Sequence, residues 1–93
     1  MAITEKELKT LRRAIKRIDE CRLQIERMAD DVNCNDEMGL KALRHLLNVD
    51  FNATIHATRI LIFAGVNGKD AYELANDQKK RPVLNYVLQA LEG

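Results

Sequence analysis

The chain has 93 residues, of which 31% are charged and 46% hydrophobic, and its formal net charge is +1 at pH 7. A chain of this length builds one compact core, so we expect a single domain over 1–93. A net charge this small provides no general attraction to nucleic acid or to an anionic membrane. One Pro and four Gly favour helix over sheet and predict an all-α fold, a small bundle of four or five helices.

The N-terminus has no apolar signal region, and no apolar run is long enough to cross a membrane. The two cysteines, Cys21 and Cys34, fit reduced thiols better than a disulfide framework. We therefore expect a soluble, cytoplasmic protein that has no membrane partner.

The first predicted element is a long amphipathic helix over about 5–31. Thr4 and Glu7 have the spacing of a capping box, which marks its start. Behind this cap, apolar residues recur in steps of three and four, a heptad pattern interrupted once by an arginine. We call this series the packing stripe: Leu8, Leu11, Ile15, Ile18, Arg22, Ile25, Ala29 and Val32.

A polar break over 30–36 separates the long helix from the bundle expected over about 36–92. The next helix starts near Asn35 or Asp36. It either ends close to Asp50, which would then cap a third helix, or runs on as one bent helix. The apolar residues over 51–63 fall on more than one side of a helix and predict the most buried element of the fold.

The remaining elements are short and are marked by Gly and Pro. Gly65 is expected to be the left-handed C-cap of a Schellman motif, with Val66 folding back on Leu61. A short helix is predicted over 69–77. After a basic linker, Pro82 suits the first position of a last helix.

Two family patterns resemble the C-terminal part. Leu61-Ile62-Phe63-Ala64-Gly65-Val66, followed by residues 68–75, is similar to the junction between two ankyrin repeats. The same residues, over about 58–77, resemble a helix-turn-helix, which implies a DNA-reading helix over 68–76. Both patterns describe two amphipathic helices joined by a glycine turn, and since one segment fits both, neither identifies a family.

No motif in the chain predicts catalysis. Cys21, Cys34, His45 and His56 are separated by eleven or more residues and lack the close pairs of a zinc site. Acidic neighbours of Cys34 would raise its pKa and weaken it as a nucleophile. There is also no phosphate-binding glycine loop. We therefore expect no catalytic residue, no metal, no cofactor and no enzymatic activity.

Charge is segregated along the N-terminal part of the chain. Residues 1–17 carry six basic and two acidic side chains, a net charge of +4, and residues 18–38 carry two basic and seven acidic ones, a net charge of −5. This order opposes the helix dipole beyond the first turn, so local stability does not explain it. An antiparallel homodimer through the packing stripe would explain it, because each basic half would lie beside an acidic half. The alternative is that the long helix folds onto the rest of its own chain.

These features predict a small protein-interaction or regulatory module that binds a macromolecular partner, with a protein as the expected partner. The alternative is a DNA-binding regulator that uses the helix-turn-helix-like segment, although the acidic residues of its reading helix would repel phosphates. The residues expected to meet a partner form a basic face: Arg12, Arg13, Lys16, Arg17, Lys79, Lys80 and Arg81.

Overall fold

The computed structural model describes residues 3–30 and 36–92, which form four α-helices and one short 3-10 helix and include no strand. The elements are α1 (Glu5–Ala29), α2 (Glu37–Phe63), α3 (Gly68–Asn76), η2 (Gln78–Lys80) and α4 (Arg81–Glu92). The predicted all-α fold with a long N-terminal helix is confirmed. The long helix ends at Ala29 with Asp30 as its C-cap, so it is shorter than the expected 5–31. Position 31 lies outside the described residues.

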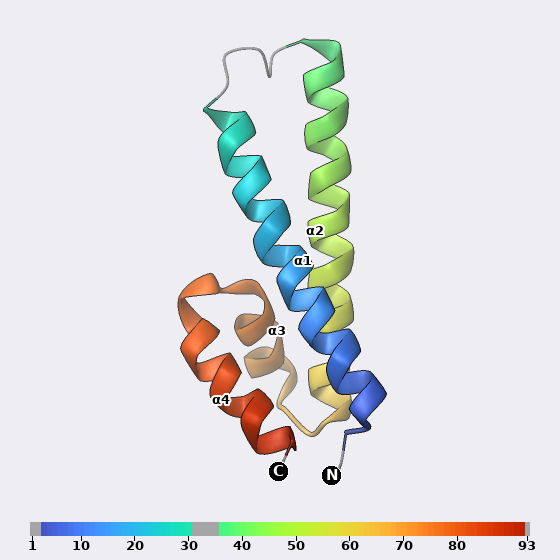
Figure 1. Ribbon diagram of the computed structural model, residues 1–93, viewed down its shortest axis with the longest axis vertical. Coiled ribbons are helices and arrows are strands. Elements are labelled where there is room, and N and C mark those ends of the chain that lie inside the picture. Colours follow the sequence, from blue (N-terminus) through green and yellow to red (C-terminus); the bar gives the residue numbers. More distant parts are fainter. Residues whose placement is uncertain (1–2, 31–35, 93) are drawn as a thin grey trace.

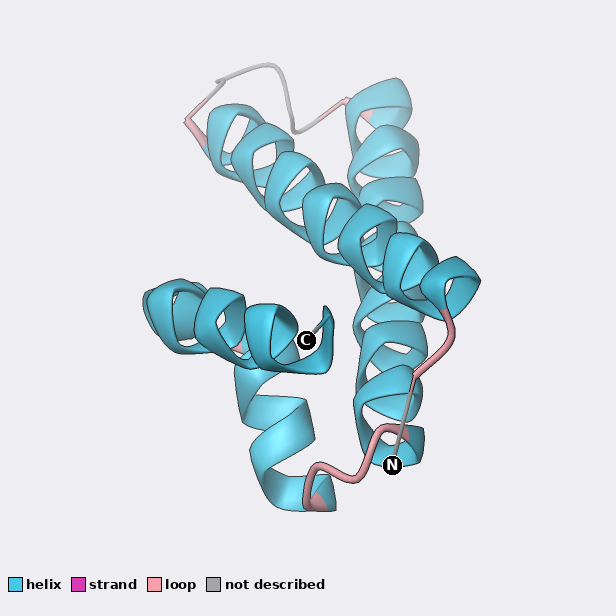
Figure 2. Ribbon diagram, turned by 60° about the horizontal axis from the view of Figure 1, so that its bottom comes forward, coloured by secondary structure: helices cyan, strands magenta, loops and turns pink. Residues whose placement is uncertain are grey.

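Two long antiparallel helices form the frame of the molecule, whose extents are 48 × 21 × 21 Å. Helices α1 and α2 form an antiparallel hairpin in which α1 crosses α2 obliquely, so that the two helices stand apart at the Ala29 and Glu37 ends, and the short helices α3 and α4 lie beside the other half of the hairpin (Figure 1). Seen from another direction, α4 lies alongside α1, while α3 lies toward the end of α2 (Figure 2). The free half of the hairpin, at the Ala29 and Glu37 ends, therefore consists of two helices without a second layer.

The start of α1 follows the predicted cap. Thr4 Oγ1 accepts a hydrogen bond from the Glu7 backbone N–H at 3.1 Å and donates one to Glu7 Oε1 at 2.8 Å. The helix then buries its apolar face against the rest of the chain, and Leu11 and Ile18 are fully buried. The long helix therefore folds onto its own chain, as one of the two alternatives expected.

Residues 37–63 form one continuous helix, which settles the alternative left open at Asp50. Asp50 lies inside α2 and does not cap a separate helix. The prediction that 51–63 is the most buried segment was wrong for its aromatic residues, because Phe51 is 64% and Phe63 is 69% exposed. Small residues such as Ala53 and Ala57 are buried in the core in their place.

The turn after α2 has the predicted geometry. Gly65 has a φ of 100°, and its N–H donates to Ile62 O while the Val66 N–H donates to Leu61 O. These are the two hydrogen bonds of a Schellman motif. Asn67 caps α3, which starts one residue earlier than expected. Pro82 is the second residue of α4. The basic segment 79–81, which was expected to be a linker, consists of the last two residues of η2 and the first residue of α4.

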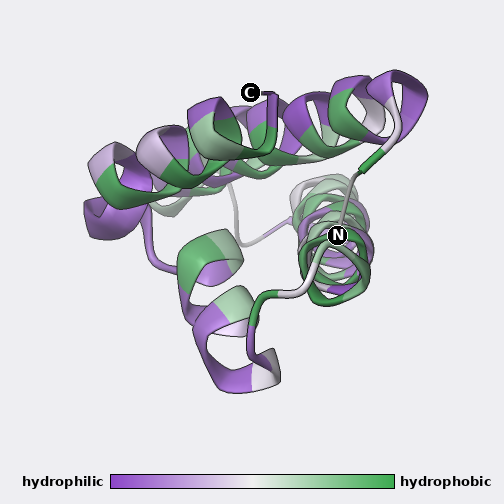
Figure 3. Ribbon diagram, turned by 90° about the horizontal axis from the view of Figure 1, so that it is seen from below, coloured by the Kyte–Doolittle hydropathy of each residue, from purple (hydrophilic) through white to green (hydrophobic). Residues whose placement is uncertain are grey.

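One apolar cluster joins all four α-helices. Figure 3 shows that the helices turn their apolar sides, in green, toward the interior and their polar sides outward. From α4, Leu84 and Leu88 are almost completely buried, and from α3, Ala71 and Ala75 are fully buried. This core holds the short helices against only one half of the hairpin.

Candidate partner-binding surface

Arg22, the interruption of the packing stripe, points into the molecule. Its Nε lies 3.2 Å from Asp50 Oδ2, and its guanidinium also donates to the backbone carbonyl and the side-chain oxygen of Asn76. The side chains of Arg22 and Asp50 are only 24% and 17% exposed. The arginine therefore joins α1, α2 and the end of α3 within one chain.

The N-terminal half of the packing stripe is used inside the monomer. Its four residues from Leu8 to Ile18 are buried, Ile25 is half-buried and Ala29 is exposed, while Val32 lies outside the described residues. A dimer through this stripe would require α1 to leave α2. The buried half of the stripe is therefore not available as a dimer seam in this fold.

The three residues of the C-terminal basic segment have different surroundings. Arg81 is 15% exposed and makes a bidentate ion pair with Asp19, with a shortest distance of 2.7 Å. Burial opposes ionisation of Asp19, but the hydrogen bonds from Arg81 and Gln78 and nearby positive charges outweigh it, so the pKa of Asp19 is lowered. Arg81 is thus a structural residue, although the sequence placed it on the basic face.

Lys80 is also paired within the chain. Its Nζ lies 2.8 Å from Glu73 Oε2, and this hydrogen bond lowers the pKa of Glu73 and raises the pKa of Lys80. Lys79 remains exposed at the surface of η2 and has no ion-pair partner among the described residues. One of the three predicted cations of this segment is therefore unengaged.

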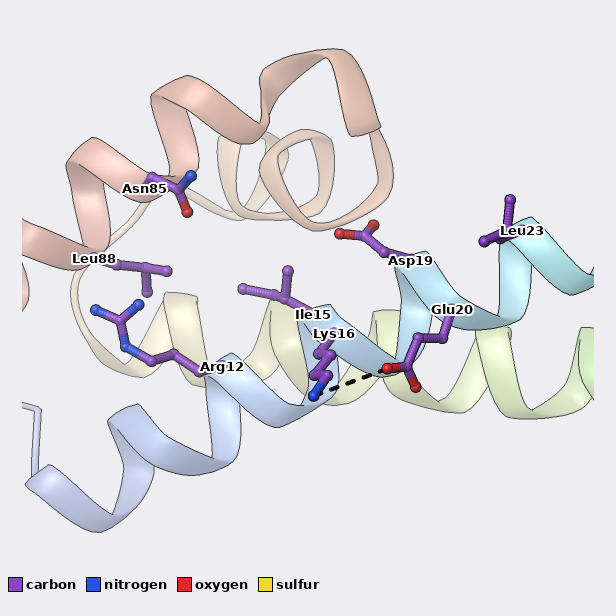
Figure 4. Close-up of a pocket in the computed structure, with 8 residues that line it drawn as sticks. All are labelled: Arg12, Ile15, Lys16, Asp19, Glu20, Leu23, Asn85 and Leu88. Carbon is purple, nitrogen blue, oxygen red and sulfur yellow. Dashed lines mark ion pairs between the residues drawn. The ribbon is translucent and has the colours of Figure 1, made fainter.

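On α1, two of the predicted basic residues also have acidic partners. Arg12 forms an ion pair with Glu92, and Lys16 Nζ lies 4.0 Å from Glu20 Oε1. Both basic residues line a cavity of about 400 Å³ between α1 and α4, where Ile15 points toward α4 (Figure 4). Positive and negative side chains share this cavity, so it has no preference for a ligand of one charge.

Arg13 and Arg17 differ from these residues because no carboxylate lies beside them in their groove. They line a groove of about 480 Å³ between α1 and α2, opposite Asn52 and His56 of α2. All four side chains are exposed, and neither arginine has an ion-pair partner within residues 3–30 and 36–92. We call this the basic groove; its full lining is Thr10, Arg13, Ala14, Arg17, Val49, Asn52, Ala53 and His56.

The helical register explains why these four side chains meet. Arg13 and Arg17 are four residues apart on α1, as Asn52 and His56 are on α2, and residues at this spacing are neighbours on one helix face. Ala14 and Ala53 form part of the floor and keep the groove open. The arrangement offers two guanidinium groups, an amide and an imidazole, which together suit an anionic ligand with several oxygens.

The predicted basic face includes only some of the residues that line the basic groove. The sequence identified Arg13 and Arg17, but Asn52 and His56 were missed, since the sequence does not show which faces of α1 and α2 are adjacent. The i, i+4 repeat of polar residues on α2 was the available signal. This repeat indicates a site only when the packing of α2 against α1 is known, because the packing places Asn52 and His56 opposite the two arginines.

Cys21 is the one cysteine in the described part of the chain. Burial raises the pKa of the Cys21 thiol, and the nearby Asp50 carboxylate raises it further, so the thiol stays protonated. Cys34 lies outside the described residues. Over residues 3–30 and 36–92, no group of three His, Cys, Asp or Glu side chains has the geometry to hold a metal ion. None of the helices in these ranges combines the length and apolarity needed to span a bilayer.

Comparisons with protein-family models, with curated proteins and with solved structures found no match to this chain.

Proposed function

We propose that this protein is a small non-enzymatic interaction module that binds an acidic segment of a protein partner through the basic groove. The observation that carries the proposal is the pair Arg13 and Arg17, which share a groove with hydrogen-bond donors and no carboxylate. Guanidinium groups bind carboxylates in a bidentate manner, with more geometric specificity than a lysine offers. Such a module acts by occupancy, as regulatory proteins do, and a cytoplasmic location belongs to the same proposal.

The size of the groove favours a peptide over a nucleic acid. Two packed helices are separated by about 8–10 Å between their axes, so the groove between them receives individual side chains and not a duplex. A partner helix or strand that presents Asp or Glu side chains at regular spacing would fit. The alternative of DNA binding loses support because Lys80 is paired with Glu73 and Arg81 with Asp19.

The proposal is tested by titrating the ¹⁵N-labelled protein with a glutamate-rich helical peptide at low and at high salt. We expect the largest chemical-shift changes at Arg13, Arg17, Asn52 and His56. Binding should be weaker at high salt, because salt screens exposed charge pairs. The double variant R13Q/R17Q should weaken binding by at least about tenfold, since each charge-assisted hydrogen bond contributes about 1.5–3 kcal/mol.

A matched control removes the same total charge elsewhere. Arg44 and Lys69 are exposed and lie outside the groove, so R44Q/K69Q should leave peptide binding nearly unchanged. An equal loss in both double variants would mean that only net charge matters and would overturn the groove as the site. Absence of peptide binding at low salt, with binding to duplex DNA under the same conditions, would replace this proposal with the nucleic-acid alternative.

A further inference from the structure

The basic groove continues beyond the residues that line it. Of its lining residues, Thr10 lies nearest to the start of α1 and His56 nearest to the end of α2. One helical turn beyond them, Lys6 and Arg59 lie on the same helix faces, because residues three or four positions apart are neighbours on a helix. The two helices are antiparallel (Figure 1), so these two basic residues extend the groove at the same end.

Positive charge is uniform along this surface. Lys6 and Arg59 are exposed, and neither has an ion-pair partner within residues 3–30 and 36–92. Together with Arg13 and Arg17 they place four positive side chains along the two helices. We call the resulting two rows the basic strip, which contains no Asp or Glu: Lys6, Thr10, Arg13 and Arg17 of α1, and Val49, Asn52, His56 and Arg59 of α2.

The acidic residues of α1 next to the strip have other surroundings. Glu7 accepts a hydrogen bond from the Thr4 hydroxyl at 2.8 Å, and Glu20 lines the cavity on the α4 side of the helix. The short helices also lie elsewhere, since α4 packs on the face of α1 that carries Ile15, and α3 packs on the face of α2 that carries Ile55. Neither short helix therefore covers the basic strip or supplies it with carboxylates.

The shape of the strip fits a helix. From Lys6 to Arg17, α1 advances by about 17 Å, or three helical turns. Ala14 and Ala53 form part of the floor between the two rows, and their small buried side chains leave room for the ridge of a third helix. A helix pairs its own backbone N–H and C=O groups, whereas an extended peptide would have to find partners for them among the side chains of two helices.

We infer that the basic strip binds an acidic α-helix of the partner protein, which lies along the hairpin for about three turns in the groove between α1 and α2. The inference rests on the proposed function and deepens it, since it assigns Lys6 and Arg59 to the same site. All three helices have the same rise per residue, so carboxylates that recur in steps of three and four on the partner meet basic residues that recur in the same steps. The partner helix therefore presents its Asp and Glu residues on one face.

Fluorescence anisotropy tests the inference with a labelled helical peptide of about 20 residues, long enough to form a helix, whose glutamates lie on one face. K6Q/R59Q should weaken binding about fivefold, the effect of losing two exposed ion pairs. R13Q/R17Q should weaken it more, because those side chains lie in the groove itself. The matched control R44Q/K69Q removes the same charge outside the strip and should leave affinity nearly unchanged. Circular dichroism verifies that the variants keep their helix content.

Altered peptides locate the contacts and test the helix. Glutamine replaces the glutamates of the first turn in one peptide and of the last turn in another. One of the two replacements should weaken binding to the wild type and leave binding to K6Q/R59Q nearly unchanged, because that variant has already lost the charges involved. A third peptide has the same composition, but a proline moved from its end to its centre breaks the helix. It should bind at least about tenfold more weakly, given the cost of a central proline.

The inference and the proposed function fail in different ways. If K6Q/R59Q binds the peptide as tightly as R44Q/K69Q does while R13Q/R17Q binds it weakly, the extension of the site is wrong and the proposed function stands. Equal binding of the peptide with the central proline would overturn the helical partner in favour of an extended acidic segment. Tighter binding of a DNA duplex at the same salt concentration would overturn the acidic helix as the ligand. If none of the peptides binds at low salt, the proposed function fails and the inference fails with it.

Discussion

Two arginines join elements that the small apolar core leaves incompletely connected. The last three carbonyls of α3, at Leu74, Ala75 and Asn76, accept hydrogen bonds from Arg81 or Arg22. Carbonyls at a helix end have no partner within the helix, and a cation there also interacts favourably with the helix dipole. Asp19 and Asp50 of the hairpin hold the two guanidinium groups in place, so α3 is attached by its C-terminal end.

This arrangement makes stability depend on pH through Asp19. Because the pKa of Asp19 is lowered in the folded protein, the folded state favours the ionised carboxylate, and the stabilisation is present above the unfolded pKa of about 3.9. It disappears as pH falls through the lower folded pKa. We expect D19N to reduce the free energy of unfolding by about 1 kcal/mol at neutral pH, a value reduced from that of a buried pair because the carboxylate is partly exposed.

Urea unfolding of the wild type and D19N between neutral pH and pH 3 measures this effect. The difference between the two proteins should be constant near neutral pH and shrink below about pH 4. E26Q, at an exposed position of the same helix, is the control and should show no comparable difference. A D19N penalty that stays unchanged at the lowest pH would show that the carboxylate charge is not its source.

At the scale of elements, the turn between α2 and α3 depends on one backbone conformation. Gly65 has a φ of 100°, and no atom lies within 4 Å of the position where a Cβ would stand. Substitution by alanine is therefore unfavourable only through the backbone, by about 1–2 kcal/mol. We expect G65A to lower the Tm by about 5 °C or more, measured by circular dichroism.

Gly68 provides the comparison for this prediction. It is the first residue of α3, and a Cβ there would lie 3.8 Å from Ile62 Cδ1, an ordinary van der Waals distance. Alanine restricts the unfolded chain more than glycine does, so G68A should leave the Tm unchanged or raise it slightly. Equal losses of stability in G65A and G68A would contradict the role of the left-handed conformation.

These elements show which parts of the fold the sequence could predict. The cap at Thr4 and the turn at Gly65 depend on residues three to five positions apart, so their signals are local and both were predicted. The ion pair of Arg22 with Asp50 joins residues 28 positions apart and depends on the register between α1 and α2. The basic groove depends on the same register, which is why only its α1 half was predicted. Phe51 was misplaced because periodicity shows that a residue is apolar but not whether a second layer covers it.

At the scale of the whole molecule, the half-covered hairpin should produce a gradient of local stability. Leu11, Ile18 and Leu61 are fully buried where α3 and α4 cover the hairpin, whereas no residue among 23–30 and 36–49 is fully buried. Segments with fewer buried apolar contacts open without global unfolding. Amide exchange measured by NMR should therefore be faster over 23–29 and 39–49 than over 11–18 and 53–61.

Two alanine variants distinguish local from global opening. L61A should lower the free energy of unfolding by about 2–5 kcal/mol, as expected for a large cavity in a core, and should speed exchange throughout the protein. Leu43 is only half-buried in the free half of the hairpin, so L43A should speed exchange mainly over 23–29 and 39–49. Uniform exchange rates along both helices in the wild type would contradict the gradient, because they would show that the hairpin opens as one cooperative unit.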